Sequence, residues 1–243
     1  PGDFDVTIKG LTMINGSESP HAGSIKNRAN LTLEQCIIRN NECDSEGGAI
    51  YSEFGDLTII DCVIDSNNCF GIGGGIYFYD GSLIIKNSTI SNNSAGWGGG
   101  IQIDGQTDSF YVENSTISGN TSQEGGGFSL YDTRGYFVNT TVTQNHADDG
   151  GGFYIDGGAE IHIVNTIIAQ NTASNGTGPD IYCPGSIYSQ GYNIIGDEID
   201  GNYVAEPTDT VGFTGTEVDP VLGPLQDNGG FTTTHALLAG SPA

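Results

Sequence analysis

The chain has 243 residues, including 39 glycines but only one methionine and one tryptophan. This length allows one large all-β domain or two small domains, and the composition favours one domain with many tight turns and few long helices. Thirty acidic residues against six basic ones give a formal net charge of −24. That charge excludes nucleic acid as a partner and disfavours an anionic membrane surface.

The chain begins with a strand-like pattern, "PGDFDVTIKG", that lacks the basic and apolar regions of a signal peptide. No apolar run approaches the length of about eighteen residues that a transmembrane helix needs. The other end, "LLAGSPA", closes without a capping motif. We therefore predict no transmembrane segment, and we expect the chain to be a mature or trimmed piece of a longer protein.

Glycine clusters followed by an apolar residue recur at a nearly constant spacing. The apolar residue returns every 25 to 28 residues, at Ile25, Ile50, Ile76, Ile101, Phe128, Phe153 and Ile181. A second column with the same period is Asn41, Asn67, Asn93, Asn120, Asn145 and Asn171. A third column is Gln35, Asp61, Asn87, Asn114, Asn139 and Asn165. Separate columns in one register indicate a structural repeat of about 26 residues.

The glycine clusters resemble phosphate-binding loops at first sight, as in "GGGFYIDGG" (150–158). A phosphate loop needs one copy, followed by Gly-Lys-Ser/Thr at the start of a helix, and no copy here has that continuation. The repetition and the missing lysine exclude a nucleotide site. The clusters are instead interpreted as sharp corners, where glycine tolerates positive φ and close backbone approach.

Residues 73–97 show the content of one repeat. Apolar and polar residues alternate in three short segments, at 76–78, 83–85 and 88–90, which predicts strands with one buried face. Units that cannot bury this face alone must stack on their neighbours. The sequence therefore predicts an all-β fold, a right-handed parallel β-helix of about seven coils spaced about 4.8 Å apart. The asparagine column is expected to form hydrogen bonds from coil to coil.

The period is lost after Gly196. We therefore predict two parts, a parallel β-helix over residues 1–196 and an irregular C-terminal cap over residues 197–243 that covers the open end of the stack.

Several segments carry a family resemblance. In the predicted cap, "DPVLGPLQDNGG" and "THALLAGSPA" resemble the C-terminal signature of bacterial right-handed parallel β-helix surface proteins of the choice-of-anchor type. The "NSTISNN", "NSTISGN" and "GGGI" segments are similar to the repeats of that family and of polymorphic outer-membrane proteins. The resemblance implies the fold and secretion to the cell surface, and little about biochemical activity. The sorting segment that it implies after "GSPA" is absent, which leaves the mode of attachment open.

Four of the five cysteines form two pairs one coil apart, and Cys183 has no column partner. Cys43 and Cys69 follow the asparagine column in a loop that can adjust to disulfide geometry, so we predict a disulfide there, with two free thiols as the alternative. Cys36 and Cys62 fall in a column of Ser and Thr and are expected to be packed thiols. A disulfide between them is the less favoured alternative, because parallel side chains in register are poorly aimed for the S–S torsion. The cysteine pairing and the acidity favour an oxidising, extracellular location.

One acidic residue per coil follows the first strand, at Glu53, Asp80, Asp104, Asp132 and Asp156. Stacked carboxylates repel one another, so they either stay solvated or bind Ca²⁺, which prefers carboxylate and carbonyl oxygens. On the second interpretation, the metal ligands are Asp80, Asp104, Asp132 and Asp156. The alternative is that the Asp-Gly pairs are only turn residues.

Tyrosines lie beside this acidic row, at Tyr51, Tyr77, Tyr79, Tyr131 and Tyr154. Pointing outward next to carboxylates, they would form a carbohydrate-binding strip, because aromatic rings stack on the apolar faces of sugars and carboxylates accept from hydroxyls. The alternative is that tyrosine is simply a favourable strand residue.

These features favour a non-catalytic extracellular protein of the cell surface. It would be an adhesin, a stalk, or a sheath or filament component that self-associates through its terminal coils, with glycans as a further partner. The alternative is a polysaccharide-degrading lyase or hydrolase, because β-helices resembling pectate lyases and polygalacturonases bind polysaccharide along such a face. A lyase would need basic residues for an acidic polymer, and only Arg134 lies in the middle of the rod. We assign no catalytic residue.

Overall fold

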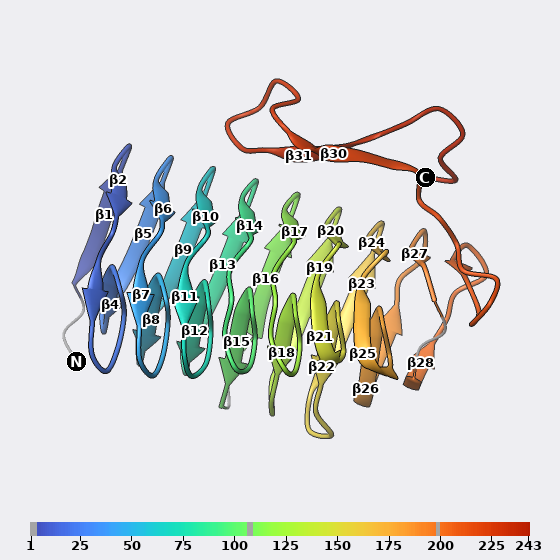
Figure 1. The fold of residues 1–243 in the computed structure, drawn as a ribbon, viewed down its shortest axis with the longest axis horizontal. Coiled ribbons are helices and arrows are strands. Elements are labelled where there is room, and N and C mark those ends of the chain that lie inside the picture. Colours follow the sequence, from blue (N-terminus) through green and yellow to red (C-terminus); the bar gives the residue numbers. More distant parts are fainter. Residues whose placement is uncertain (1–3, 106–108, 198–199) are drawn as a thin grey trace.

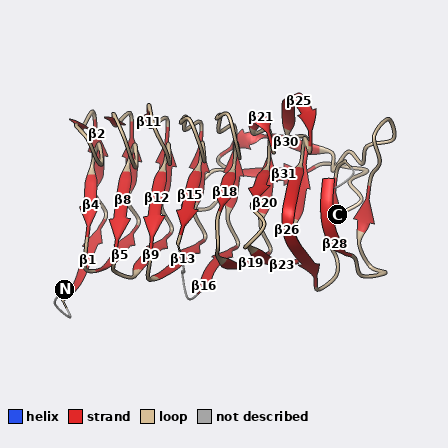
Figure 2. Ribbon diagram, turned by 90° about the horizontal axis from the view of Figure 1, so that it is seen from below, coloured by secondary structure: helices blue, strands red, loops and turns tan. Residues whose placement is uncertain are grey.

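The computed structural model describes residues 4–105, 109–197 and 200–243, and all the elements in these residues are β-strands. The strands form coils that stack into a rod, with the N-terminus at one end (Figure 1). A view turned by 90° shows successive strands side by side along the rod (Figure 2). The predicted all-β parallel β-helix of about seven coils with a repeat near 26 residues is therefore confirmed.

Two walls of each coil belong to one 15-stranded sheet. The first wall contains β4 (Ile25–Asn27), β8 (Ile50–Glu53), β12 (Ile76–Tyr79), β15 (Ile101–Asp104), β18 (Phe128–Leu130) and β22 (Phe153–Ile155). The second wall contains β1 (Asp5–Lys9), β5 (Asn30–Glu34), β9 (Leu57–Ile60), β13 (Ser82–Lys86), β16 (Ser109–Glu113), β19 (Arg134–Val138) and β23 (Glu160–Val164). Strand β26 (Ile181–Ser189) pairs with β22 and β23 and so joins the two walls, and β28 (Asp200–Val204) pairs with β26.

The third wall is a separate nine-stranded parallel sheet. It contains β2 (Thr12–Ile14), β6 (Ile37–Arg39), β10 (Val63–Asp65), β14 (Thr89–Ser91), β17 (Thr116–Ser118), β20 (Thr141–Thr143), β24 (Ile167–Ala169), β27 (Ile194–Ile195) and β29 (Thr210–Val211). Short strands lie at one corner, β3 (Ser17–Glu18), β7 (Glu42–Cys43), β11 (Asn68–Cys69), β21 (His146–Asp149) and β25 (Thr172–Thr177). The chain ends in an antiparallel hairpin of β30 (Leu222–Gln226) and β31 (Thr234–Leu237).

Equivalent apolar residues of successive coils meet in the interior. Ile76 of β12 pairs with the corresponding isoleucines of β8 and β15, and all three are fully buried. Further along, the rings of Phe128, Phe137 and Phe153 lie within 5.3 Å of one another by their centroids. Burying one side chain of this kind contributes roughly 1.5–3 kcal/mol, so the continuous apolar column is the main source of stability.

The predicted asparagine ladder is present. Asn93 Nδ2 and the Asn93 backbone N–H both donate to Asn120 Oδ1 at 3.0 Å, and Asn120 Nδ2 donates to Asn145 Oδ1 at 2.9 Å. The same pattern runs from Asn41 to Asn171, where the Asp180 carboxylate replaces the next amide. Each amide is buried and bonded to the coils on both sides, so the column ties the corners together.

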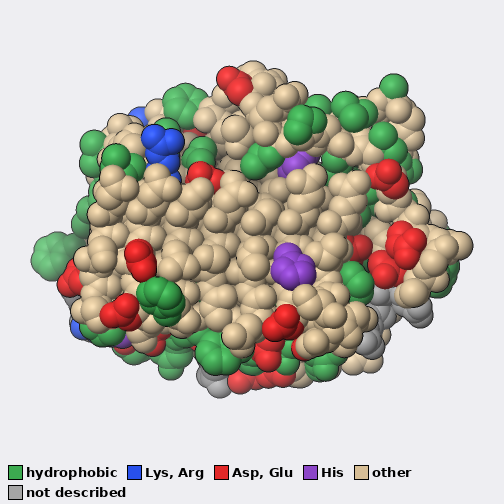
Figure 3. Space-filling view, in the orientation of Figure 1, with side chains coloured by type: hydrophobic (Ala, Val, Ile, Leu, Met, Phe, Trp, Pro, Cys, Tyr) green, Lys and Arg blue, Asp and Glu red, His purple; other side chains and the backbone are tan. Residues whose placement is uncertain are grey.

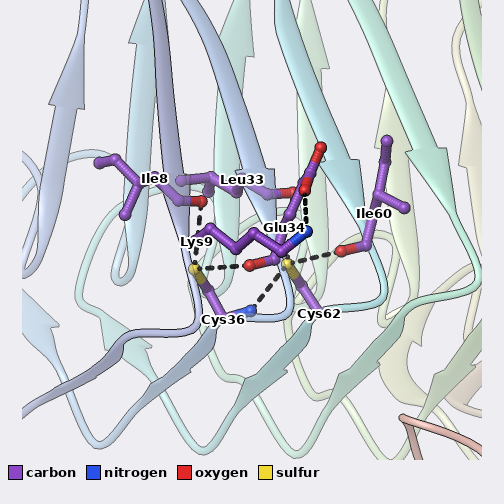
Figure 4. Close-up of polar contacts among 7 residues, drawn as sticks. All are labelled: Ile8, Lys9, Leu33, Glu34, Cys36, Ile60 and Cys62. Carbon is purple, nitrogen blue, oxygen red and sulfur yellow. Dashed lines mark hydrogen bonds and ion pairs between the residues drawn. The ribbon is translucent and has the colours of Figure 1, made fainter.

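A second ladder runs between the second and third walls and contains two of the cysteines. Ser88 Oγ accepts from the Cys62 backbone N–H at 3.1 Å and donates to Lys86 O at 2.7 Å. One coil earlier, the Cys62 thiol accepts from the Cys36 backbone N–H at 3.3 Å and donates to Ile60 O at 3.2 Å (Figure 4). Burial raises the pKa of the Cys62 thiol to about 11. These cysteines therefore take the place of hydroxyl side chains, as packed thiols.

The glycine corners follow from the close approach of successive coils. A Cβ atom on Gly100 would lie 2.6 Å from Gly127 O in the next coil, a distance that no side chain tolerates. Two residues earlier, Gly98 has a φ of +60°, a left-handed conformation that glycine adopts without strain. The clusters are therefore structural, in agreement with the rejection of a nucleotide loop.

The segment after Gly196 extends the rod and then turns back. Strands β28 and β29 continue the two sheets, and the β30–β31 hairpin then lies along the third wall (Figure 1). Thr89 Oγ1 donates to Thr233 O at 2.6 Å, and Ser118 Oγ lies 2.9 Å from His235 Nε2. The segment therefore lies along one side of the rod, where only a cap over its end was expected. The boundary at residue 196 stays a prediction.

Candidate carbohydrate-binding surface

A row of side chains lies where the first-wall strands end. Tyr79 pairs with Glu53 in one neighbouring coil and with Asp104 in the other, and the same register continues through β18 and β22. The row is therefore Glu53, Tyr79, Asp104, Tyr131 and Asp156, in which carboxylates and tyrosines alternate. Each member lies three residues after the buried apolar residue that begins its strand.

The prediction of one carboxylate row is wrong at Asp80 and Asp132. These residues lie one position further along, in exposed turns with positive φ angles of 61° and 45°. The error arises because strand register counts from the buried apolar residue, whereas the Asp-Gly pair moves by one residue between coils. In the described part of the chain, no three His, Cys, Asp or Glu side chains are grouped so that they could hold a metal ion. Calcium binding at Asp80, Asp104, Asp132 and Asp156 stays a prediction that this geometry does not support.

A second outward column of the first wall contains four of the eleven tyrosines. Its members in register are Tyr51, Tyr77, Gln102, Ser129, Tyr154 and Tyr182. The rings of Tyr51 and Tyr77 stack with a centroid distance of 5.5 Å, and His21 stacks on Tyr51 at 4.8 Å. Ile72 packs against this cluster, and the two tyrosines are only 7% and 9% exposed. The expectation of an exposed strip is therefore wrong for Tyr51 and Tyr77, because other side chains occupy their ring faces.

The tyrosine column is interrupted at Gln102 and Ser129, which carry no rings. A hollow of about 200 Å³ opens at this interruption, lined by Ile72, Trp97, Gln102, Asp104 and Tyr131. Trp97 comes from the corner before β15 and is 43% exposed, whereas Gln102 is 2% exposed. We name this feature the Trp97 hollow. It brings together two predicted site residues, Asp104 and Tyr131, with a tryptophan and a glutamine that the sequence had not indicated.

Hydrogen bonds fix the sides of the Trp97 hollow. On one side, Gln102 Nε2 donates to Asp104 Oδ1 at 2.5 Å, and the Tyr77 hydroxyl is also hydrogen-bonded to the Asp104 carboxylate. On the other side, the Tyr131 hydroxyl donates to Glu124 Oε2 at 2.9 Å. The bond between Tyr131 and Glu124 connects the strand-end row to the corner before β18. It forms the side of the hollow that lies toward β18.

Burial dominates the electrostatics of these groups. It raises the pKa of the Asp104 carboxyl above its ordinary value, while the hydrogen bonds from Gln102 and Tyr77 oppose that shift. Burial also raises the pKa of Tyr77, with the nearby Asp104 charge as the second cause. For Tyr131, burial and the bond to Glu124 both raise the pKa. The two tyrosines therefore act as neutral hydrogen-bond donors at physiological pH.

The remaining predicted residues lie on either side of the Trp97 hollow. Tyr79 is 38% exposed and packs edge-on against Phe54, with centroids 5.6 Å apart. Tyr154 lies beside Tyr131, at a centroid distance of 6.0 Å, and is half-buried. Of the predicted tyrosines, Tyr79, Tyr131 and Tyr154 therefore stay accessible beside Trp97, which is a shorter surface than the predicted strip.

A second ring column on the second wall was missed from the sequence. Tyr111, Tyr136, His162 and Tyr188 stack from coil to coil with centroid distances of 4.8 to 5.2 Å and interplanar angles of 8° to 22°. Counting by the repeat of about 26 residues would have found it. Because each ring covers the face of the next, the column mainly offers ring edges to a ligand, so its role is structural.

Cys43 and Cys69 meet as predicted, in register on β7 and β11. Their sulfur atoms lie 2.9 Å apart, and both residues are buried free thiols in this structure. The disulfide stays a prediction.

The surface charge is unevenly distributed. The face in Figure 3 is mostly backbone and uncharged polar side chains, and acidic side chains outnumber lysine and arginine on it. Arg134, the basic residue in the middle of the rod, forms an ion pair with Glu160 at 2.5 Å. The face in Figure 3 therefore shows few lysine or arginine side chains, and Arg134 is paired with a carboxylate.

Comparison with protein families agrees with this geometry. The family model described as "Right handed beta helix region" matches residues 2–173, which is more than half of the chain. The chain belongs to this right-handed β-helix family. No curated protein and no solved structure matches it. In the described residues, no helix is long and apolar enough to cross a membrane.

Proposed function

We propose that this protein is a non-catalytic, extracellular β-helix protein of the cell surface that binds glycans at the Trp97 hollow. The observation that carries the proposal is the meeting of an exposed Trp97 ring and a half-buried Tyr131 ring with the half-buried Asp104 carboxylate and the buried Gln102 amide. Adhesin, stalk and filament roles all agree with a rod that carries such a surface.

The chemistry of the Trp97 hollow suits a sugar. Indole and phenol rings stack on the apolar face of a pyranose, and a carboxylate and an amide accept hydrogen bonds from its hydroxyls. A hollow of about 200 Å³ is smaller than typical drug-sized pockets, so it would hold one sugar unit. Tyr79 and Tyr154 lie on either side along the rod, where they would contact neighbouring units of an oligosaccharide.

Glycan-array screening of the purified chain tests the proposal, followed by isothermal titration calorimetry with the strongest hit. Trp97→Ala is expected to weaken binding at least about fivefold, because a stacked aromatic side chain contributes on the order of 1–3 kcal/mol to such contacts. The matched control is Phe231→Ala, which removes a 67% exposed ring on the C-terminal hairpin. A chain that binds no glycan, or a Trp97→Ala variant with full affinity, would contradict the proposal.

Self-association is tested separately. Strands β1 and β2 lie at the edge of the sheets in the described chain, and unpaired strand edges can add further strands. Electron microscopy of the purified protein distinguishes monomeric rods from filaments. Monomers at high concentration would leave the adhesin and stalk roles and remove the filament role.

A polysaccharide hydrolase is the second candidate, and one observation favours it. Burial raises the pKa of Asp104, as in the general acid of glycosidases, which must stay protonated near its working pH. A hydrolase also needs a second carboxylate at a defined separation. Incubation with neutral and acidic polysaccharides, with detection of new reducing ends, tests this candidate. Product formation that is lost in Asp104→Asn would replace the binding role by catalysis.

A further inference from the structure

Gln102 contributes a buried acceptor that no group in the described residues satisfies. Its Nε2 donates to Asp104 Oδ1, which fixes the orientation of the amide, because the reverse orientation would set two oxygens against each other. Gln102 Oε1 has no hydrogen-bond partner in the described chain, although the residue is only 2% exposed. An unpaired buried acceptor costs roughly 1–3 kcal/mol. A donor on a ligand in the Trp97 hollow would recover that energy.

Two of the three nearby hydroxyl donors are already used, and the third, on Ser129 in register with Gln102, has no hydrogen-bond partner in the described chain. The Tyr77 hydroxyl is bonded to Asp104, and the Tyr131 hydroxyl donates to Glu124. The side chains that line the hollow also offer two acceptors to a ligand, the Asp104 carboxylate and Gln102 Oε1, beside the Trp97 indole N–H and the second N–H of Gln102. Trp97 and Tyr131 add aromatic rings, which attract cations through their quadrupoles.

The Asp104 charge also lacks a basic partner. The described lysine and arginine ion pairs involve other carboxylates, those of Glu34, Glu53, Glu113 and Glu160. A half-buried carboxylate without a cation is costly, and a ligand ammonium group would compensate it. A sugar hydroxyl can donate a hydrogen bond there but cannot neutralise the charge.

We infer that the Trp97 hollow is a subsite for the protonated amine of an amino sugar. The ammonium group would donate to the Asp104 carboxylate and to Gln102 Oε1, between the rings of Trp97 and Tyr131. This inference rests on the proposed glycan-binding function and narrows it to glycans that carry a free amino group. Uronic acids and sulfated sugars are disfavoured, because the chain has a formal net charge of −24.

Three tetrasaccharides of the same linkage test the inference by isothermal titration calorimetry, those of glucosamine, N-acetylglucosamine and glucose. The measurement is made at about pH 6, where an amine of ordinary pKa is protonated. The glucosamine tetrasaccharide is expected to bind at least about tenfold more tightly than the other two, which is the effect of one charge-assisted hydrogen bond. Asp104→Asn, which keeps an acceptor for Gln102, is expected to remove this preference.

The matched control is Asp148→Asn, which removes one exposed charge from β21 and is expected to keep the preference. If the three tetrasaccharides bind equally, or if Asp104→Asn keeps the preference, the amine subsite is contradicted while glycan binding stands. If none of them binds and the glycan array is also empty, the proposed function fails and the inference fails with it. A lysine-rich peptide that binds in place of the glucosamine tetrasaccharide would also overturn the assignment.

Discussion

The inner and outer columns of the rod follow the same repeat with different results. The asparagine ladder is filled in every coil from Asn41 to Asn171. The outer tyrosine column, in contrast, is interrupted for two coils, at Gln102 and Ser129. Loss of an asparagine from the inner column would leave buried polar groups unpaired. Loss of a ring from the outer tyrosine column instead opens a hollow to solvent. The repeat therefore specifies the fold, and the interruption is the place where we propose that a ligand binds.

The largest expected effect comes from breaking the inner column. Asn120→Ala removes the acceptor of two bonds from Asn93 and both bonds donated by Asn120 Nδ2, to Ile90 O and Asn145 Oδ1. Because each unpaired buried group costs roughly 1–3 kcal/mol, we expect the free energy of unfolding to fall by at least about 3 kcal/mol. Urea denaturation measures this. The control Asn175→Ala, at an exposed position, should change it by less than about 0.5 kcal/mol.

The end of the inner column predicts a pH dependence. Burial raises the pKa of the Asp180 carboxyl to about 6, from an ordinary value of 3.8. The folded state therefore binds this proton more tightly than the unfolded state does, so the contribution of Asp180 to stability is fully present below about pH 4 and is lost as the pH rises through about 6. The loss amounts to about 3 kcal/mol at most, from the size of the shift.

The variant Asp180→Asn isolates this contribution. An amide at this position does not titrate. The difference in free energy of unfolding between the native chain and the variant should therefore change over the interval from about pH 4 to about pH 6. Denaturation curves across that interval provide the measurement. A difference that does not vary with pH would show that Asp180 titrates normally.

Filling the outer interruption should abolish binding without harming the fold. Gln102→Tyr would continue the ring column after Tyr77 and occupy the Trp97 hollow, so glycan affinity is expected to fall more than about tenfold while the thermal midpoint stays or rises. The control Gln123→Tyr adds the same ring at an exposed corner position. Calorimetric titration and a thermal melt measure the two effects. Full affinity in Gln102→Tyr would place the binding site elsewhere.

The smallest expected effect concerns the hydrogen bond that closes one side of the hollow. Tyr131→Phe removes the hydroxyl that donates to Glu124, and the free energy of unfolding should fall by about 1 kcal/mol. Tyr111→Phe, on a 42% exposed ring of the second wall, should leave it nearly unchanged. Equal effects in the two variants would show that the Glu124 bond contributes nothing.

The sequence predicted the features that depend on the period alone. The apolar column, the asparagine ladder and the packed thiols of Cys36 and Cys62 all repeat at fixed offsets, so alignment of the repeats was enough to find them. The row at the strand ends was partly misread, because the Asp-Gly pairs shift by one residue between coils. Counting three residues from the buried Ile76 or Phe128 would have placed Tyr79 and Tyr131 correctly.

The Trp97 hollow depends on contacts that the repeat does not contain. Its walls require that Ile72 and Trp97 from the corner lie over the first wall, and that Tyr131 reaches Glu124. Periodicity shows that Gln102 replaces a ring, but it does not show what covers the rings of Tyr51 and Tyr77. Exposure of an outward side chain is therefore a property of the folded corner, which the strand pattern alone does not determine.

A crystal structure of the chain with the glucosamine tetrasaccharide tests the central claim most directly. We predict one sugar unit beside the Trp97 ring, with its amino nitrogen about 3 Å from an Asp104 carboxylate oxygen and within hydrogen-bond distance of Gln102 Oε1. A sugar bound along the second-wall rings of Tyr111 and Tyr136, with the hollow left empty, would contradict the account.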